Sequence, residues 1–113
     1  MASKNNSDPY CLENLVEEAK AQLKQEKLGL ETLLLLRWSL GYWELIKEKM
    51  GDDGYDSING LESECSFVPY RGEHKKLPEK ELSEIRVEVE RYFLIHDKII
   101  RDLLGGISNL ASD

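Results

Sequence analysis

Two stretches of this chain combine side chains that could carry out chemistry. The thiol of Cys65 and the imidazole of His74 share one turn-rich segment, where a thiolate and imidazole pair could act as a nucleophile, although the spacing supplies no third group to orient them. Asp52, Asp53 and Asp56 cluster like the start of a calcium loop, but neither register has the glycine that an EF-hand needs at its sixth position. We therefore expect no metal site and no cofactor.

A third candidate is the segment from Arg91 to His96, in which four residues separate an arginine from a histidine. This spacing resembles the motif of the HEPN superfamily of helical, dimeric ribonucleases and toxin-like proteins, which is an arginine, four to six residues and a histidine. The resemblance implies a catalytic role for His96 and a phosphate contact for Arg91, at an RNA-cleaving site formed between two subunits. Tyr92 stands where the family often has a polar residue. On a regular helix Arg91 and His96 lie about 140° apart, so one of them faces the buried side.

His96 also belongs to a seam that predicts a long helix from Pro78 until Gly105 and Gly106 stop it. The seam residues follow one another at spacings of three and four: Leu82, Ile85, Val89, Tyr92, His96, Ile99 and Leu103. Such a stripe has to be buried against another helix of the same chain or of a second copy. We interpret His96 first as a polar residue at a core or interface position.

Two further helices precede this one. The first is predicted from Asp8 and Pro9, which suit a helix start, to about Lys27. The second, about Leu30 to Met50, is apolar over more than half of its circumference, so other helices or a second subunit must contact it from more than one direction. Its aromatic residues are expected in the core first and as partner-binding residues second: Trp38, Tyr42 and Trp43.

The fold class predicted from these elements is all-α, a small helical bundle of three main helices with a long loop between the second and third. The loop covers residues 51–77, which are rich in turn-forming residues. The chain of 113 residues fits one domain. We expect a flexible N-terminal leader at 1–7, a single helical domain at 8–106 and a short C-terminal tail at 107–113.

The charge excludes some classes of partner. Fifteen basic and 22 acidic residues give a net charge of −7, which repels nucleic acids and anionic membrane surfaces. Two cysteines favour a reducing compartment, and Arg37 and Glu44 interrupt the longest apolar stretch before it could span a bilayer. We therefore expect a cytoplasmic protein that binds neither membranes nor nucleic acid directly.

The function predicted from the sequence is that of a non-enzymatic, acidic adaptor or regulatory protein. It would act by helix packing with a protein partner or with a second copy, as a homodimer. The predicted interface consists of Leu82, Ile85, Val89, Tyr92, His96, Ile99, Leu103, Trp38, Tyr42 and Trp43, with the 51–77 loop as a second contact. Two alternatives stay open: a HEPN-like ribonuclease or toxin-type domain using Arg91 and His96, and an acidic inhibitor of a nucleic-acid-binding protein.

Overall fold

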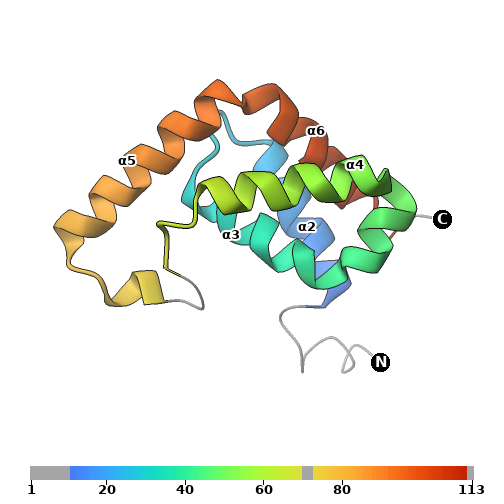
Figure 1. Cartoon of the computed structure of the whole chain (residues 1–113), viewed down its shortest axis with the longest axis horizontal. Coiled ribbons are helices and arrows are strands. Elements are labelled where there is room, and N and C mark those ends of the chain that lie inside the picture. Colours follow the sequence, from blue (N-terminus) through green and yellow to red (C-terminus); the bar gives the residue numbers. More distant parts are fainter. Residues whose placement is uncertain (1–10, 70–72, 112–113) are drawn as a thin grey trace.

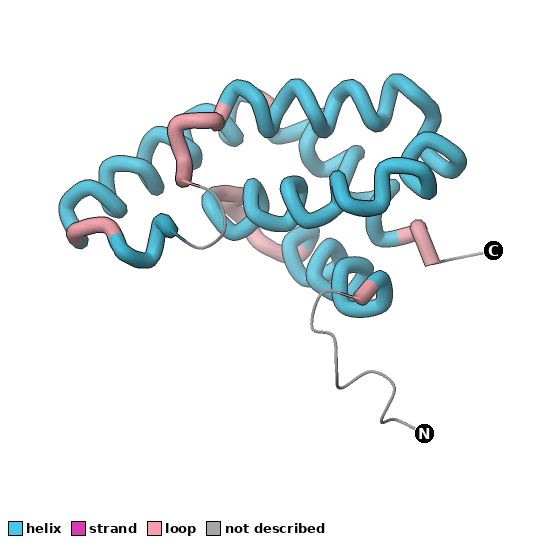
Figure 2. Tube along the Cα trace, turned by 60° about the horizontal axis from the view of Figure 1, so that its bottom comes forward, coloured by secondary structure: helices cyan, strands magenta, loops and turns pink. Residues whose placement is uncertain are grey.

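The computed structural model describes residues 11–69 and 73–111, and within these ranges the chain consists of helices and connecting turns, without a strand (Figure 2). The predicted all-α class is confirmed. The predicted leader at 1–7 and the predicted helix start at Asp8 and Pro9 lie outside the described residues.

Helices α2 (Leu12–Leu23) and α6 (Asp97–Ser108) form the most extensive helix pair of the described residues. Both bury residues three and four positions apart, which fall on one face of a helix. The buried residues are Leu15, Val16 and Ala19 of α2 and Ile100, Leu103, Leu104 and Ile107 of α6. This pair joins the two ends of the described chain in one core.

Arg101 of α6 binds the backbone at and just beyond the end of α2. Its guanidinium donates hydrogen bonds to the backbone oxygens of Leu23, Gln25 and Glu26, at 3.2, 2.8 and 3.0 Å. A cation at a helix C-terminus satisfies carbonyls that have no partner within the helix and complements the helix dipole. Helix α2 ends at Leu23, before the predicted end near Lys27, and Arg101 stabilises this end.

Helix α3 (Leu30–Ser39) occupies the centre and contacts α2, α4 and α5. The prediction that this segment is contacted from several directions is confirmed, since it buries Leu30, Leu33, Leu35 and Leu36. The prediction that it continues to Met50 is wrong. A 3-10 turn at Leu40–Tyr42, which contains Gly41, redirects the chain into the next helix.

Helix α4 (Trp43–Glu64) occupies much of the predicted loop, so the prediction of a loop from residue 51 is wrong. The helix bends at Gly51, whose φ of 81° and ψ of 170° suit a residue without a Cβ. Beyond the bend Ile58, Leu61 and Glu62 are buried. Their burial on one face compensates for the low helix propensity of Gly54 and Gly60. The remaining described connection is 65–69, a short 3-10 helix at Glu73–Lys76, and Leu77 and Pro78.

The predicted long third helix is two helices. Helix α5 (Glu79–Ile95) ends at His96, and α6 begins at Asp97. His96 has a φ of −106° and a ψ of 22°, outside the helical range, so the chain turns there and α6 folds back along α2 (Figure 1). The turn lets both helices face one core, which a straight helix of this length could not do.

The predicted helix end at Gly105 and Gly106 is also wrong, because α6 continues to Ser108. Gly106 lies against Met50 of α4, and a Cβ added to Gly106 would be 2.6 Å from the methionine Cε. The glycine thus provides room for a neighbouring side chain. Ile107 and Leu110 are buried, so the core extends into the predicted tail at 107–113.

Candidate functional site

The predicted interface residues fall into three environments. Val89 and Leu103 are buried within the chain, and six others are half-buried: Leu82, Ile85, Tyr92, His96, Trp38 and Tyr42. Ile99 and Trp43 are the exposed members, at 50% and 47%. Most of the predicted seam therefore packs inside the chain, and a surface for partners has to be sought on other faces of α5.

Trp43 is held in place by a lysine. The amino group of Lys47 lies 5.3 Å from the centroid of the Trp43 ring and 4.9 Å from that of Tyr55. Cation–π contacts of this kind stabilise exposed aromatic side chains modestly. Since Trp43 precedes the bend at Gly51 and Tyr55 follows it, the lysine also joins the two arms of α4.

The outer side of α5 exposes large apolar residues. Val87, Leu94 and Ile95 are 52%, 72% and 73% exposed, and with Arg91 they fall within an arc of about 100° on the helix. We call these four residues the α5 outer face. Leaving one such apolar side chain in water forgoes about 1.5–3 kcal/mol of burial free energy. The cost is recovered only if another surface covers the face.

A hollow of about 260 Å³ lies beside the α5 outer face, between α5 and the connection that follows α2. Its apolar lining consists of Leu28, Val87 and Leu94. Charged residues of both signs surround this lining: Glu26, Lys27, Glu90, Arg91 and Asp97. The hollow gives the exposed helix a concave neighbour that could receive an apolar side chain.

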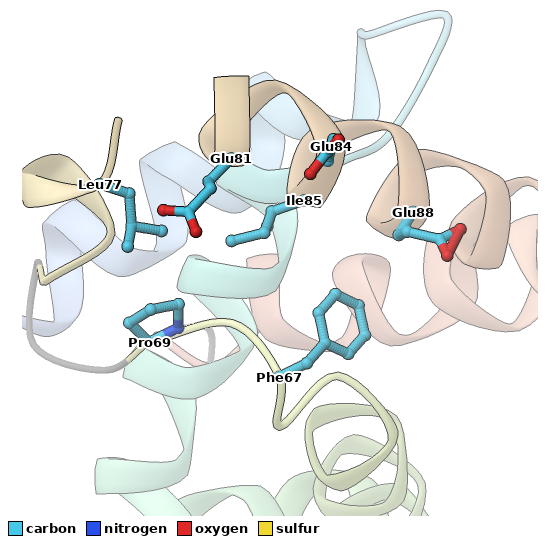
Figure 3. Close-up of a pocket in the computed structure, with 7 residues that line it drawn as sticks. All are labelled: Phe67, Pro69, Leu77, Glu81, Glu84, Ile85 and Glu88. Carbon is cyan, nitrogen blue, oxygen red and sulfur yellow. The ribbon is translucent and has the colours of Figure 1, made fainter. Parts of the chain in front are cut away.

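A second concavity, of about 310 Å³, lies between α5 and the segment that follows α4 (Figure 3). Its lining combines four apolar residues with three glutamates of α5: Phe67, Pro69, Leu77 and Ile85, and Glu81, Glu84 and Glu88. Figure 3 shows Phe67 and Pro69 facing Ile85 and Leu77 across the opening. We call this feature the acidic groove.

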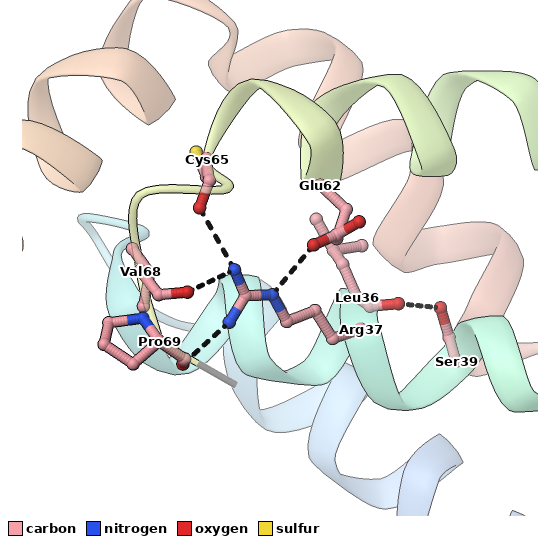
Figure 4. A network of polar contacts seen from close by, with 7 residues as sticks. All are labelled: Leu36, Arg37, Ser39, Glu62, Cys65, Val68 and Pro69. Carbon is pink, nitrogen blue, oxygen red and sulfur yellow. Dashed lines mark hydrogen bonds and ion pairs between the residues drawn. The ribbon is translucent and has the colours of Figure 1, made fainter. Parts of the chain in front are cut away.

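Arg37 of α3 holds the 65–69 segment, which forms one wall of the acidic groove. Its Nε lies 3.1 Å from a carboxylate oxygen of Glu62, and both side chains are only 10% exposed. Its two terminal nitrogens donate to the backbone oxygens of Cys65, Val68 and Pro69, at 3.0, 2.8 and 3.1 Å (Figure 4). We call this arrangement the Arg37 clamp. A buried arginine with such a set of acceptors holds the chain in one conformation.

The Arg37 clamp decides which side chains of the 65–69 segment face outward. With the backbone fixed, Cys65 and Val68 are fully buried, whereas Phe67 is 51% exposed at the groove. The sequence identified Arg37 only as an interruption of the longest apolar stretch and did not predict this role. The available signal was a single arginine within the apolar run from Leu33 to Leu40.

Cys65 does not supply the thiolate that a nucleophilic pair requires. Burial raises the pKa of its thiol to about 11, despite the opposing effect of the nearby Arg37 guanidinium. A protonated, buried thiol is a poor nucleophile at neutral pH. The side chain of His74, its predicted partner, lies outside the described residues.

The structure also bears on two other features of the sequence, the aspartate cluster and the apolar stretch that was compared with a membrane span. Asp52, Asp53 and Asp56 are exposed on α4. In the described ranges, no three side chains of the usual ligand types come together as a metal site. Nor does any helix there combine the length and the apolar character needed to cross a bilayer.

Arg91 and His96 lie in different surroundings. Arg91 is exposed on the α5 outer face and pairs with Glu88 at 2.7 Å. His96 is half-buried at the junction of α5 and α6, with its ring centroid 4.5 Å from that of Tyr92. A ribonuclease site that unites them between two subunits stays a prediction of the sequence.

Comparisons with models of protein families, with curated proteins and with solved structures give no match. A function for the chain therefore has to be argued from its own surfaces. Two surfaces stand out, the α5 outer face with its neighbouring hollow and the acidic groove.

Proposed function

We propose that this chain is a non-enzymatic, acidic helical adaptor that self-associates through the α5 outer face. The observation that carries the proposal is the exposure of Val87, Leu94 and Ile95 on one side of one helix. Contiguous exposed apolar residues framed by charged ones are typical of protein-binding surfaces. A second copy of the chain is the occupant that fits this face best.

Part of the α5 outer face can pair with the same part of a second copy. If two α5 helices pack antiparallel about an axis between Glu90 and Arg91, Val87 meets Leu94 of the partner subunit. Arg91 then meets Glu90 of the partner subunit. Each apolar contact and each opposite-charge contact occurs twice, as a two-fold symmetric interface requires. The self-complementary register supports a second copy over an unrelated partner.

The hollow beside the face adds depth to this interface. Leu94 of one copy projects beyond its own helix, and the apolar lining at Leu28 and Val87 of the other offers a receiving surface. Apolar side chains that enter such hollows are commonly the residues that contribute most to affinity. Leu94 is therefore the residue whose change should have the largest effect on association.

Light scattering at micromolar concentration and neutral pH tests the proposal. We expect a mass near twice the 13.0 kDa of one chain, and we expect Leu94→Glu to reduce it to that of a monomer. Phe67→Glu is the matched control, because it places the same charge at a half-exposed apolar residue outside the α5 outer face. A monomeric wild type, or a dimer that tolerates Leu94→Glu, would refute self-association through this face.

An RNA cleavage assay checks the enzymatic alternative on the same preparations. The adaptor function predicts no cleavage by the wild type and an unchanged mass for His96→Leu. Cleavage that the wild type performs and His96→Leu loses would replace the adaptor by the ribonuclease.

A further inference from the structure

We infer that the acidic groove binds a basic segment of another protein, anchored by one apolar side chain. This function goes beyond self-association, because it uses the neighbouring side of α5 and adds a partner. It would make the dimer an adaptor with one docking site for a basic chain on each copy. The inference stands on the shape of the groove, its charge and the fixed position of its wall.

The apolar part of the groove offers an anchoring site. Of the chain's two phenylalanines, Phe93 is fully buried, whereas Phe67 is half exposed at the groove. Phe67 and Ile85 lie on opposite sides of the opening (Figure 3). The volume of about 310 Å³ is at the lower limit for binding sites of whole ligands. It suits one leucine-sized or phenylalanine-sized side chain rather than a cofactor.

The negative charge of the groove favours basic residues in the ligand, next to the apolar side chain that anchors it. Glu81, Glu84 and Glu88 line the groove at successive turns of α5 and span about 10 Å along its axis. Among the described residues, Glu81 and Glu84 have no ion-pair partner, and Glu88 already pairs with Arg91. Lysine or arginine side chains on either side of the anchor would complement the two unpaired carboxylates.

Other occupants fit the groove less well. Three carboxylates distributed over about 10 Å of helix do not converge on a single cation. A second copy of this chain carries the same net charge of −7 and would bring repulsion to an acidic surface. An extended segment advances about 3.3 Å per residue, so three or four of its residues span the row of glutamates. We expect such a segment to carry an apolar residue between two basic ones.

The wall of the groove is in place before a partner arrives. The Arg37 clamp fixes the backbone at Cys65, Val68 and Pro69, so a binding segment does not have to order this part of the chain. A preformed site loses less conformational entropy on binding than a flexible one. This property favours a short linear segment as the ligand.

Fluorescence anisotropy can test the inference with one defined probe, a labelled heptapeptide of alternating lysine and leucine. The test variant is Glu81→Gln with Glu84→Gln. The matched control is Glu13→Gln with Glu18→Gln, two exposed glutamates of α2 that do not line the groove and lose the same charge. We expect the test variant to weaken binding about three- to tenfold and the control to weaken it less than twofold. Phe67→Ser should also weaken binding, since it removes the apolar contact without changing the charge.

Three results would overturn the inference. One is failure of the wild type to bind the peptide at any concentration up to about the millimolar range. Another is equal weakening by the groove pair and the α2 pair, which would show attraction to net charge alone. The third is a lower solution mass for Glu81→Gln with Glu84→Gln, which would assign the groove to a second copy of the chain. Peptide binding by Leu94→Glu separates this inference from self-association, since that variant should bind the peptide normally even as a monomer.

Discussion

Helices α5 and α6 are consecutive in the chain and use their apolar residues differently. Helix α6 has 12 residues and buries Ile100, Leu103, Leu104 and Ile107. Helix α5 has 17 residues and buries only Val89 and Phe93. The longer helix thus contributes less to the core and leaves more of its apolar surface exposed.

The neighbours of the two helices explain the difference. Helix α6 lies along α2 and also contacts α4, so it is covered over its length. Helix α5 contacts α3 and α6 less extensively and extends away from the remaining helices toward its N-terminus (Figure 1). Since a broad part of α5 is free, it can present the outer face and, next to it, the acidic groove.

The largest expected contrast is between two leucines, one in each helix. Leu104→Ala should lower the free energy of unfolding by about 2–5 kcal/mol, because it leaves a cavity in the core where Leu104 is fully buried. Leu94→Ala should change it by no more than about 0.5 kcal/mol, since this side chain is 72% exposed. Urea denaturation of dilute protein measures both. Similar losses would mean that α5 is as important to the core as α6.

A smaller contrast is expected between two arginines. Arg101→Ala removes hydrogen bonds to three backbone oxygens at the end of α2 and an ion pair with Asp97, so it should cost about 1–3 kcal/mol. Arg91→Ala removes one exposed ion pair with Glu88, which contributes at most about 1 kcal/mol. The same denaturation experiment decides between them. A larger loss of stability for Arg91→Ala would contradict the conclusion that Arg101 supports the packing of α6 on α2 while Arg91 is a surface residue.

The smallest expected effect concerns the contact of α5 with the end of α4 at alkaline pH. Burial raises the pKa of the Cys65 thiol from 9.0 to about 11. Burial, together with the nearby Glu64 and Cys65, also raises the pKa of the Tyr92 hydroxyl. The unfolded chain therefore loses these protons at lower pH than the folded chain. The stabilisation is complete below pH 9 and is lost as the pH rises toward 11.

Denaturation at pH 8 and at about pH 9.8 measures the first part of this loss. The wild type should lose about 1 kcal/mol more than Cys65→Ala between the two values, because the variant lacks the thiol. An equal loss in both proteins would exclude Cys65 as a source of alkaline instability. Hydrogen exchange at the higher pH should show α5 opening before α6.

Local periodicity was sufficient to predict some of the fold. The apolar spacing of α2 and the broad apolar surface of α3 both correspond to buried residues in the structure. Periodicity failed where tertiary contacts decide the outcome. The seam continues through His96 without a change of spacing, so it contained no sign that the chain turns there.

The helical part of α4 after Gly51 could not be predicted for a related reason. Its glycines, aspartates and asparagine favour turns, and only packing of Ile58 and Leu61 on the core stabilises the helix. The candidate surfaces were predicted only in part. Exposure of Val87 and Leu94 depends on how α5 is oriented, and the groove depends on Arg37 binding a segment far along the chain.

The contact between Met50 and Gly106 has a consequence for how this sequence can change over time. The thioether occupies the space in which a side chain at position 106 would lie, so Gly106→Ala requires the end of the Met50 side chain to move. A smaller residue at position 50 would remove the obstacle and leave a gap that the new methyl group partly fills. The two positions are therefore coupled, and a substitution at one changes which side chains fit at the other.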